Sequence, residues 1–200
     1  MKRTEQWKQL TFGQKLQYLW DYEKWILTVI VTAICMICIG ITIYHNMKTE
    51  VLLRVIVTDA QSDGTALAEQ FRAYLGATGE DQTVEVDNTV VTNEENSMVG
   101  GASTMKLTSL IAANHMDVMI CNESLYEQFE KQGAFLDIRE VLGEDAEAYA
   151  EDIVGDVICM DAEKLNGIDP ISPYEKIYVA ILVNSENREN AADFIRFLEQ

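Results

Sequence analysis

The residues that could do chemistry in this sequence are few and scattered. His45 and His115 are the only histidines of the 200-residue chain. Neither has the neighbouring cysteine, histidine or carboxylate side chains that a zinc site requires. The sequence also lacks the G-x-S-x-G motif of an activated serine. We therefore expect no metal site and no cofactor, and we expect that the protein is not an enzyme.

The remaining polar groups of interest follow the carboxyl ends of predicted strands. Open α/β sheets bind ligands at that edge, where each strand passes into a helix. We expect groups from several loops to converge there into a polar shelf. Because surrounding carboxylates disfavour anions, the shelf would bind a neutral or cationic group. The candidate ligand-binding residues are Asp59, Gln61, Ser62, Ser103, Thr104 and Asn122, with Cys121 beside the last of them.

Several of these groups also have a purely structural explanation. Ser62 or Asp63 can cap the helix that follows, with Gly64 easing the turn, and Asn122 can cap the next helix. Gly100-Gly101 precedes another predicted helix, where exposed amides could receive an anion. It lacks the lysine of a phosphate loop and is also explained as a flexible loop. The sequence leaves both explanations open.

An uncharged apolar run from Ile26 to Tyr44 precedes all of these groups. Its length suits one helix that crosses a bilayer, which needs about 20 residues. Trp25 and Tyr44 supply the aromatic rings that settle at the headgroup level. A cleaved signal peptide is the alternative, but it would have a shorter apolar core and small residues before its cleavage site. We therefore expect a transmembrane helix over residues 26–45 that contacts the lipid bilayer.

Basic residues determine the expected orientation. The five lysines and arginines before the apolar run outnumber Lys48 and Arg54, which lie just after it. The positive-inside rule then places the N-terminus in the cytoplasm. We expect a cytoplasmic tail over residues 1–25, with an amphipathic helix starting at Thr11, and an extracellular domain over residues 46–200. The chain would be a single-pass protein of the plasma membrane.

The expected outer domain is strongly acidic. From Asn46 onward it contains 30 acidic and 10 basic residues, and the whole chain carries a formal net charge of −18. Nucleic acid is disfavoured as a partner, because binding it requires a basic face. The length of this part suits one compact domain with a substantial core. Cys121 and Cys159 are the cysteines available for an external disulfide, although such a core does not need one.

Hydrophobic patterning predicts strands that alternate with helices. Residues 51–57 and 177–183 are nearly continuous apolar runs, which are typical of buried strands. β-Branched residues predict further strands at 83–92, 117–121 and 157–160. Amphipathic patterns predict helices from Ser62 to Gly76, at 107–111 after a loop over 93–103, from Asn122 to Gly133, at 144–153, and from a start within 185–190 to Leu198. Residues 135–142 are compatible with a short strand or with a turn of helix. This alternation indicates an α/β domain with a mostly parallel sheet in three layers.

Two stretches resemble the extracellular solute-binding proteins of bacterial transport systems. Residues 106–137 are similar to a helix, strand and helix of that family, and residues 178–198 to its returning strand and final helix. The resemblance implies one lobe of a periplasmic-binding-protein fold. The N-terminal FGQKLQYLWDYEKW before a single apolar run also resembles single-pass proteins of Gram-positive bacteria.

The space between Asp137 and Tyr178 is too short for the second lobe that closes the ligand cleft in that family. A half-cleft buries little of a small ligand. The resemblance therefore implies a membrane-anchored extracytoplasmic binding or interaction module, whose partner is a transporter or another membrane protein. The alternative is a solute receptor subunit of an ABC-type transporter, in which another chain completes the cleft around a small-molecule ligand.

Overall fold

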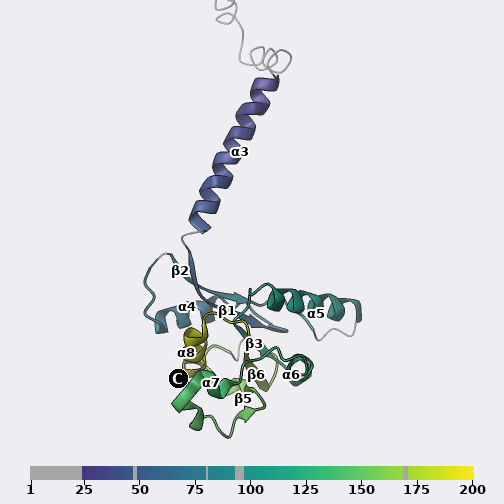
Figure 1. The fold of residues 1–200 in the computed structure, drawn as a ribbon, viewed down its shortest axis with the longest axis vertical. Coiled ribbons are helices and arrows are strands. Elements are labelled where there is room, and N and C mark those ends of the chain that lie inside the picture. The colour runs from purple at the N-terminus through teal and green to yellow at the C-terminus, as the bar shows by residue number, and fades with distance from the viewer. Residues whose placement is uncertain (1–23, 47–48, 80, 93–96, 169–170) are drawn as a thin grey trace, which may run out of the picture. The chain divides into compact units, whose positions relative to one another are not determined.

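The structure is a computed structural model that describes residues 24–46, 49–79, 81–92, 97–168 and 171–200. It divides the chain into two compact units, Met1–Thr49 and Glu50–Gln200. The amphipathic helix expected from Thr11 lies outside the described residues. The first unit contains helix α3 (Lys24–Asn46; Figure 1). Its large apolar side chains between Val29 and Tyr44 are exposed. Within the described residues, no helix is both long enough and apolar enough to cross a membrane.

The second unit is built on a six-stranded sheet with the order β2-β1-β3-β6-β5-β4. β1 is parallel to both β2 and β3, whereas the pairs β3–β6, β6–β5 and β5–β4 are antiparallel. The strands are β1 (Glu50–Val57), β2 (Gln82–Asp87), β3 (Val118–Cys121), β4 (Ile153–Val154), β5 (Val157–Asp161) and β6 (Lys176–Ile181).

The domain is therefore mixed α/β, and the expectation of a mostly parallel sheet is wrong for every pairing beyond β3. A parallel connection usually needs a crossover helix that carries the chain back to the edge from which it came. Among its described residues, the connection from β5 to β6 contains only the short 3-10 helix η2 (Ala162–Lys164). β6 consequently runs back along the sheet and inserts between β3 and β5.

The predicted helices lie at their expected positions, with two differences. In addition, residues 138–142, which the sequence left open between a short strand and a turn of helix, are helical. The loop expected over 93–103 is wrong from Ser97 onward, because these residues form the start of α5; Leu107, which is fully buried, anchors that helix. The acidic helix expected at 144–153 is replaced by the 3-10 helix η1 (Gly143–Glu147). The α-helices of this unit are α4 (Thr65–Tyr74), α5 (Ser97–Ala112), α6 (Glu123–Glu130), α7 (Ile138–Leu142) and α8 (Arg188–Leu198).

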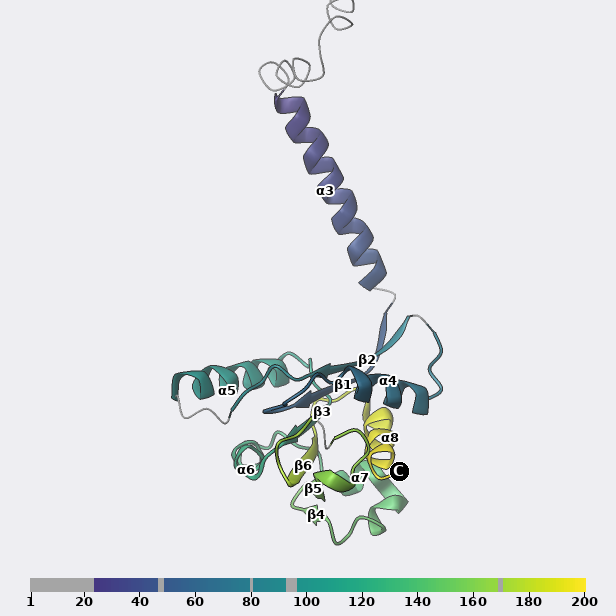
Figure 2. The same ribbon diagram turned by 180° about the vertical axis from the view of Figure 1, so that it is seen from behind.

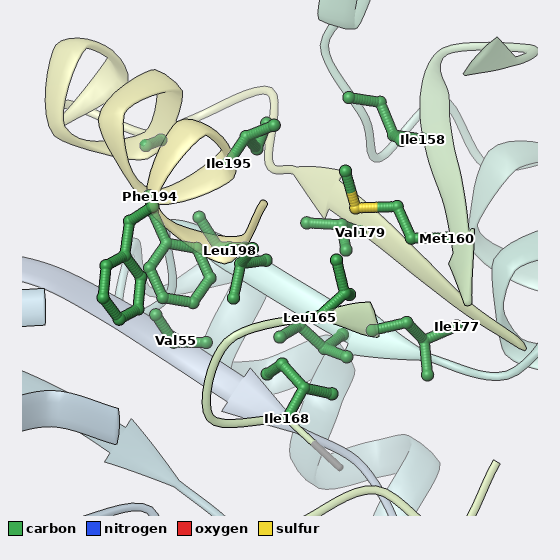
Figure 3. Close-up of a cluster of buried hydrophobic side chains, with 14 of the residues drawn as sticks. Val55, Ile158, Met160, Leu165, Ile168, Ile177, Val179, Phe194, Ile195 and Leu198 are labelled. Carbon is green, nitrogen blue, oxygen red and sulfur yellow. The ribbon is translucent and has the colours of Figure 1, made fainter. Parts of the chain in front are cut away.

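Helices cover both faces of the sheet, which gives three layers (Figures 1 and 2). On one face, alternate strand residues such as Val55 and Val179 pack against α4, α7 and α8. Figure 3 shows this cluster, in which Phe194 and Leu198 of α8 point toward the strands. On the other face, Met119 and Ala180 pack against α5 and α6.

Cys121 and Cys159 do not pair, and both are free. Each is the register partner of Tyr178, which lies between them on β6. Because neighbouring strands are about 4.8 Å apart, two strand spacings separate these cysteines by about 10 Å. A disulfide requires Cα atoms within about 7 Å. The register of the sheet thus excludes the disulfide that the sequence left open.

Candidate functional site

Asp59 organises the carboxyl end of β1. Its backbone has a left-handed φ of 55°, a conformation that aspartate tolerates better than most residues. The side chain is 8% exposed, and its carboxylate accepts hydrogen bonds from the backbone N–H and the hydroxyl of Thr92. The Asp59 N–H also donates to the carbonyl of Val90 at 2.8 Å. Asp59 therefore holds the segment after β2 against the end of β1.

Tyr174 links Asp59 to the end of β3. Its hydroxyl donates to Asp59 Oδ2 at 2.8 Å and accepts from Asn122 Nδ2 at 3.0 Å. The other side-chain atom of Asn122, Oδ1, accepts from the N–H of Leu125 at 2.9 Å and so caps α6. We call Asp59, Thr92, Asn122 and Tyr174 the edge network. It joins the ends of β1 and β3 with segments that follow β2 and precede β6.

The electrostatics of the edge network keep Tyr174 protonated. Burial is the largest influence and raises the pKa of its phenol, while the hydrogen bond from Asn122 acts in the opposite direction and the contact with Asp59 raises the pKa further. A protonated phenol can donate to a carboxylate, as Tyr174 does to Asp59. Such a hydrogen bond to a charged acceptor is stronger than one between neutral groups.

The connection between β5 and β6 runs past this edge of the sheet. The N–H of Gln61, just after β1, donates to the carbonyl of Ile171 at 2.8 Å. Ile168 and Ile171 are buried in the core that α8 also lines. Together with Tyr174, these contacts bring the chain's own connection over the ends of β1 and β3. The expected polar shelf is therefore bonded to the protein itself at Asp59 and Asn122.

The other predicted site residues contribute differently. Gln61 and Ser62 are exposed, and each takes part through its backbone; the Ser62 carbonyl accepts from Asn88 Nδ2 at 2.9 Å. Ser62 does not cap α4, because the cap position is Gly64. The neighbouring Asp63 instead accepts a hydrogen bond from the first helical N–H, that of Thr65, at 3.0 Å.

Ser103 and Thr104 are half-buried residues of α5 and do not lie in a loop. The Thr104 carbonyl accepts a hydrogen bond from the Thr108 hydroxyl, as in a regular helix turn. Gly100-Gly101 likewise falls within α5 and does not precede it. Both expectations for this pair, exposed amides before a helix and a flexible loop, are therefore wrong. Cys121 is buried, and burial raises the pKa of its thiol. Its side chain belongs to the core.

Sequence reasoning missed Thr92 and Tyr174. Tyr174 stands two residues before β6, outside every helix and strand that the sequence predicts. Its partner Asp59 is 115 positions away in the chain, and no local pattern connects the two. The one available signal was that Tyr174 lies next to a buried strand, because the hydroxyl of a buried tyrosine usually has a hydrogen-bond partner.

A second feature lies at the end of β5. A pocket of about 410 Å³ carries side chains of both charges, and its Lys164 and Asp161 form an ion pair at 2.5 Å. The pocket is lined by Asp152, Cys159, Met160, Asp161, Lys164, Leu165, Lys176 and Glu199. In the part of the chain that the structure describes, no group of three or more His, Cys, Asp or Glu side chains is placed to hold a metal ion.

Comparison of the chain with models of protein families, with curated proteins and with solved structures finds no match.

Proposed function

We propose that this protein is a membrane-anchored, extracytoplasmic interaction module, derived from one lobe of a solute-binding protein. Its acidic domain would bind another membrane protein, and residues 26–45 would hold it in the plasma membrane with the N-terminus in the cytoplasm. The chain would carry out no reaction of its own.

One observation carries the choice of an interaction module over a solute receptor. The edge at which an open α/β sheet receives a ligand is occupied by Tyr174, which bonds to both Asp59 and Asn122. A solute would have to displace these hydrogen bonds from a largely buried carboxylate, which lowers its net affinity. The polar groups at this edge are thus better suited to fixing the fold than to capturing a solute.

The order of elements supports descent from a solute-binding lobe. The residues of the first resemblance contain the C-terminal part of α5 and all of β3 and α6, and those of the second contain most of β6 and all of α8. β6 lies directly beside β3, and α8 packs on the same sheet. These are the roles of returning strand and final helix that the resemblance implies.

The proposal of a membrane anchor rests on the apolar run from Ile26 to Tyr44 and on the basic residues that precede it. Side chains such as Ile30, Ile34 and Ile37 are more than half exposed along α3. Burial of this apolar surface in lipid would remove it from water, which is favourable by about 25 cal/mol of free energy for each Å² buried.

A solute receptor remains the second candidate because of the pocket at the end of β5. Its volume of about 410 Å³ falls within the range of small-molecule sites, roughly 300–1,000 Å³. Opposite charges on its walls, such as Lys176 and Glu199, would suit a polar solute with both signs of charge.

Thermal unfolding of the full chain in lipid nanodiscs separates the two functions. Amino acids, sugars and short peptides would be added one class at a time. A solute present at 100 times its dissociation constant stabilises the folded state by about 2.7 kcal/mol. We expect no class to raise the midpoint. If one class raises the unfolding midpoint and Lys176→Glu abolishes that increase, the protein is a solute receptor and the proposal of an interaction module is wrong.

The positive test of an interaction module is chemical cross-linking on intact cells, with the full chain carrying an epitope tag after Gln200. We expect a discrete adduct with one other membrane protein, and we expect added protease to remove the tag. Protection of the tag would contradict the orientation. The absence of any adduct would contradict the interaction itself.

A further inference from the structure

β2 forms one margin of the sheet, and no other described strand pairs with its outer side. An edge strand presents a row of backbone N–H and C=O groups that can template an added strand. Natural proteins often protect such an edge with charged side chains or proline. β2 has no proline, and its charged residues are Glu85 and Asp87.

Those charges are already engaged on one face of β2. Glu85 accepts from Arg54 Nε at 3.2 Å, and Asp87 pairs with Lys106 of α5 at 3.0 Å. Burial of Asp87 raises the pKa of its carboxyl, but hydrogen bonds from Thr89 and the charge of Lys106 outweigh burial, so the pKa lies below its ordinary value. Asp87 therefore stays ionised and paired with Lys106 at neutral pH.

The opposite face of β2 borders an apolar groove. Val84 and Val86 pack on the core that α4 covers, and Gly64 lies so close that an added Cβ would stand 2.2 Å from Val86 Cγ1. The groove has a volume of about 230 Å³. It is lined by Asp63, Gly64, Thr65, Ala68, Val84, Val86 and Asn88. We call β2 together with this lining the β2 groove.

We propose that the β2 groove binds an extended peptide of a basic partner protein, which adds to the sheet as a further strand. Backbone hydrogen bonds to β2 would supply affinity, and a branched apolar side chain in the groove would supply specificity. Basic residues next to that side chain in the added strand would point to the other face of the sheet, where Glu85 lies. This inference names a surface for the interaction module and rests on that proposed function.

Charge decides between a basic partner and a second copy of this chain. Two copies of β2 paired side by side would bring Glu85 and Asp87 close to the same residues of the other strand, and like charges opposite each other destabilise a sheet. The side chain of Glu85 is 56% exposed even though it pairs with Arg54, and Asp63 is exposed. Lysine or arginine in the partner would be attracted to both.

Binding of synthetic peptides to the full chain in detergent micelles tests the inference. The probe is a blocked, fluorescently labelled nonapeptide of alternating lysine and valine, and anisotropy reports its binding. A second peptide carries N-methyl groups on all of its backbone nitrogens, which keeps its charge and removes the N–H donors along both of its edges. We expect the methylated peptide to bind at least tenfold more weakly. Equal binding of the two peptides would show attraction by charge alone and would overturn the proposal.

Variants of the β2 groove supply the second arm. Ala68→Leu fills the groove, and Glu85→Lys reverses the charge on the opposite face of β2. Each should weaken binding of the lysine-valine peptide at least fivefold. Glu147→Lys makes the same charge change on η1, which lines no part of the groove, and should leave binding within twofold. Thermal unfolding of each variant verifies that it is folded. Unchanged binding by both groove variants would exclude this surface.

The same variants separate this inference from the function on which it rests. If the cross-linked adduct on cells persists in Ala68→Leu and Glu85→Lys, the interaction module stands and the β2 groove is the wrong surface. If both variants lose the adduct and Glu147→Lys keeps it, the groove is the docking site. If the wild-type chain forms no adduct, the proposed function itself is wrong.

Discussion

At the scale of single residues, Tyr174 decides what the carboxyl edge of the sheet can do. Its hydroxyl both donates and accepts, and it joins Asp59, which is 8% exposed, to the cap residue of α6. Asn122 therefore has two roles, as a helix cap and as a member of the edge network. Polar residues at a sheet edge are easily taken for a ligand site, and here two of the six predicted residues are bound to the chain's own tyrosine.

Tyr174→Phe should lower the free energy of unfolding by about 1–3 kcal/mol, because it removes a hydrogen bond to a largely buried carboxylate and leaves that group less satisfied. Chemical denaturation of the full chain measures the change. Tyr74→Phe is the control: Tyr74 is 37% exposed, and loss of its hydroxyl should change stability by less than about 0.5 kcal/mol. Equal losses of stability at both positions would show that the hydroxyl of Tyr174 does not stabilise the edge network.

At the scale of elements, the close approach of α4 to β2 depends on a residue without a side chain. Gly64 is buried with φ −87°, so its backbone conformation is open to any residue and only space restricts it. The methyl group of an alanine would stand 2.2 Å from Val86 Cγ1. Gly101 in α5 is the converse case, with nothing within 4 Å of an added Cβ.

Gly64→Ala should destabilise the domain by about 1–3 kcal/mol, because α4 and β2 must separate to admit the methyl group. Gly101→Ala should leave stability unchanged or raise it by up to about 1 kcal/mol, because alanine favours the helix and meets no obstacle. Denaturation midpoints of the two variants test the contrast. A neutral Gly64→Ala would mean that α4 packs less tightly on β2 than the structure has it.

At the scale of the whole molecule, two buried tyrosines make stability depend on alkaline pH. Burial, reinforced by the charge of Glu199, raises the pKa of Tyr149 to about 12. Burial, reinforced by Cys159 and Glu123, raises the pKa of Tyr178 to about 12 as well. In the unfolded chain both would titrate near their ordinary value of about 10. The folded state therefore holds these protons more tightly than the unfolded state.

The contribution of these two tyrosines to the free energy of unfolding should be constant below about pH 10. It should fall as the pH rises from about 10 to 12. The sign follows because the folded state binds more protons in that interval, so rising pH favours unfolding. Urea denaturation at a series of pH values measures the slope. Tyr149→Phe should reduce the slope, since it removes one of the groups that the folded state keeps protonated. An identical slope in that variant would contradict the shifted pKa of Tyr149.

The sequence by itself determined most of the elements of this domain, because apolar periodicity is a local property. Strands such as β1 and β3, and helices such as α6 with its Asn122 cap, follow from the spacing of apolar residues and from capping chemistry within a few positions. The two-residue strand β4 was missed, because it is too short to show alternation.

Only the tertiary structure decided the direction of β6, the fate of the cysteines and the identity of the edge network. Strand direction depends on which neighbour a strand joins, and the apolar run at 177–183 is equally compatible with a parallel or an antiparallel place. β6 keeps the two free cysteines apart, because it inserts between β3 and β5. No local sequence pattern predicts that insertion. The bond between Tyr174 and Asp59 spans 115 positions, and such contacts arise from chain topology and not from local preference.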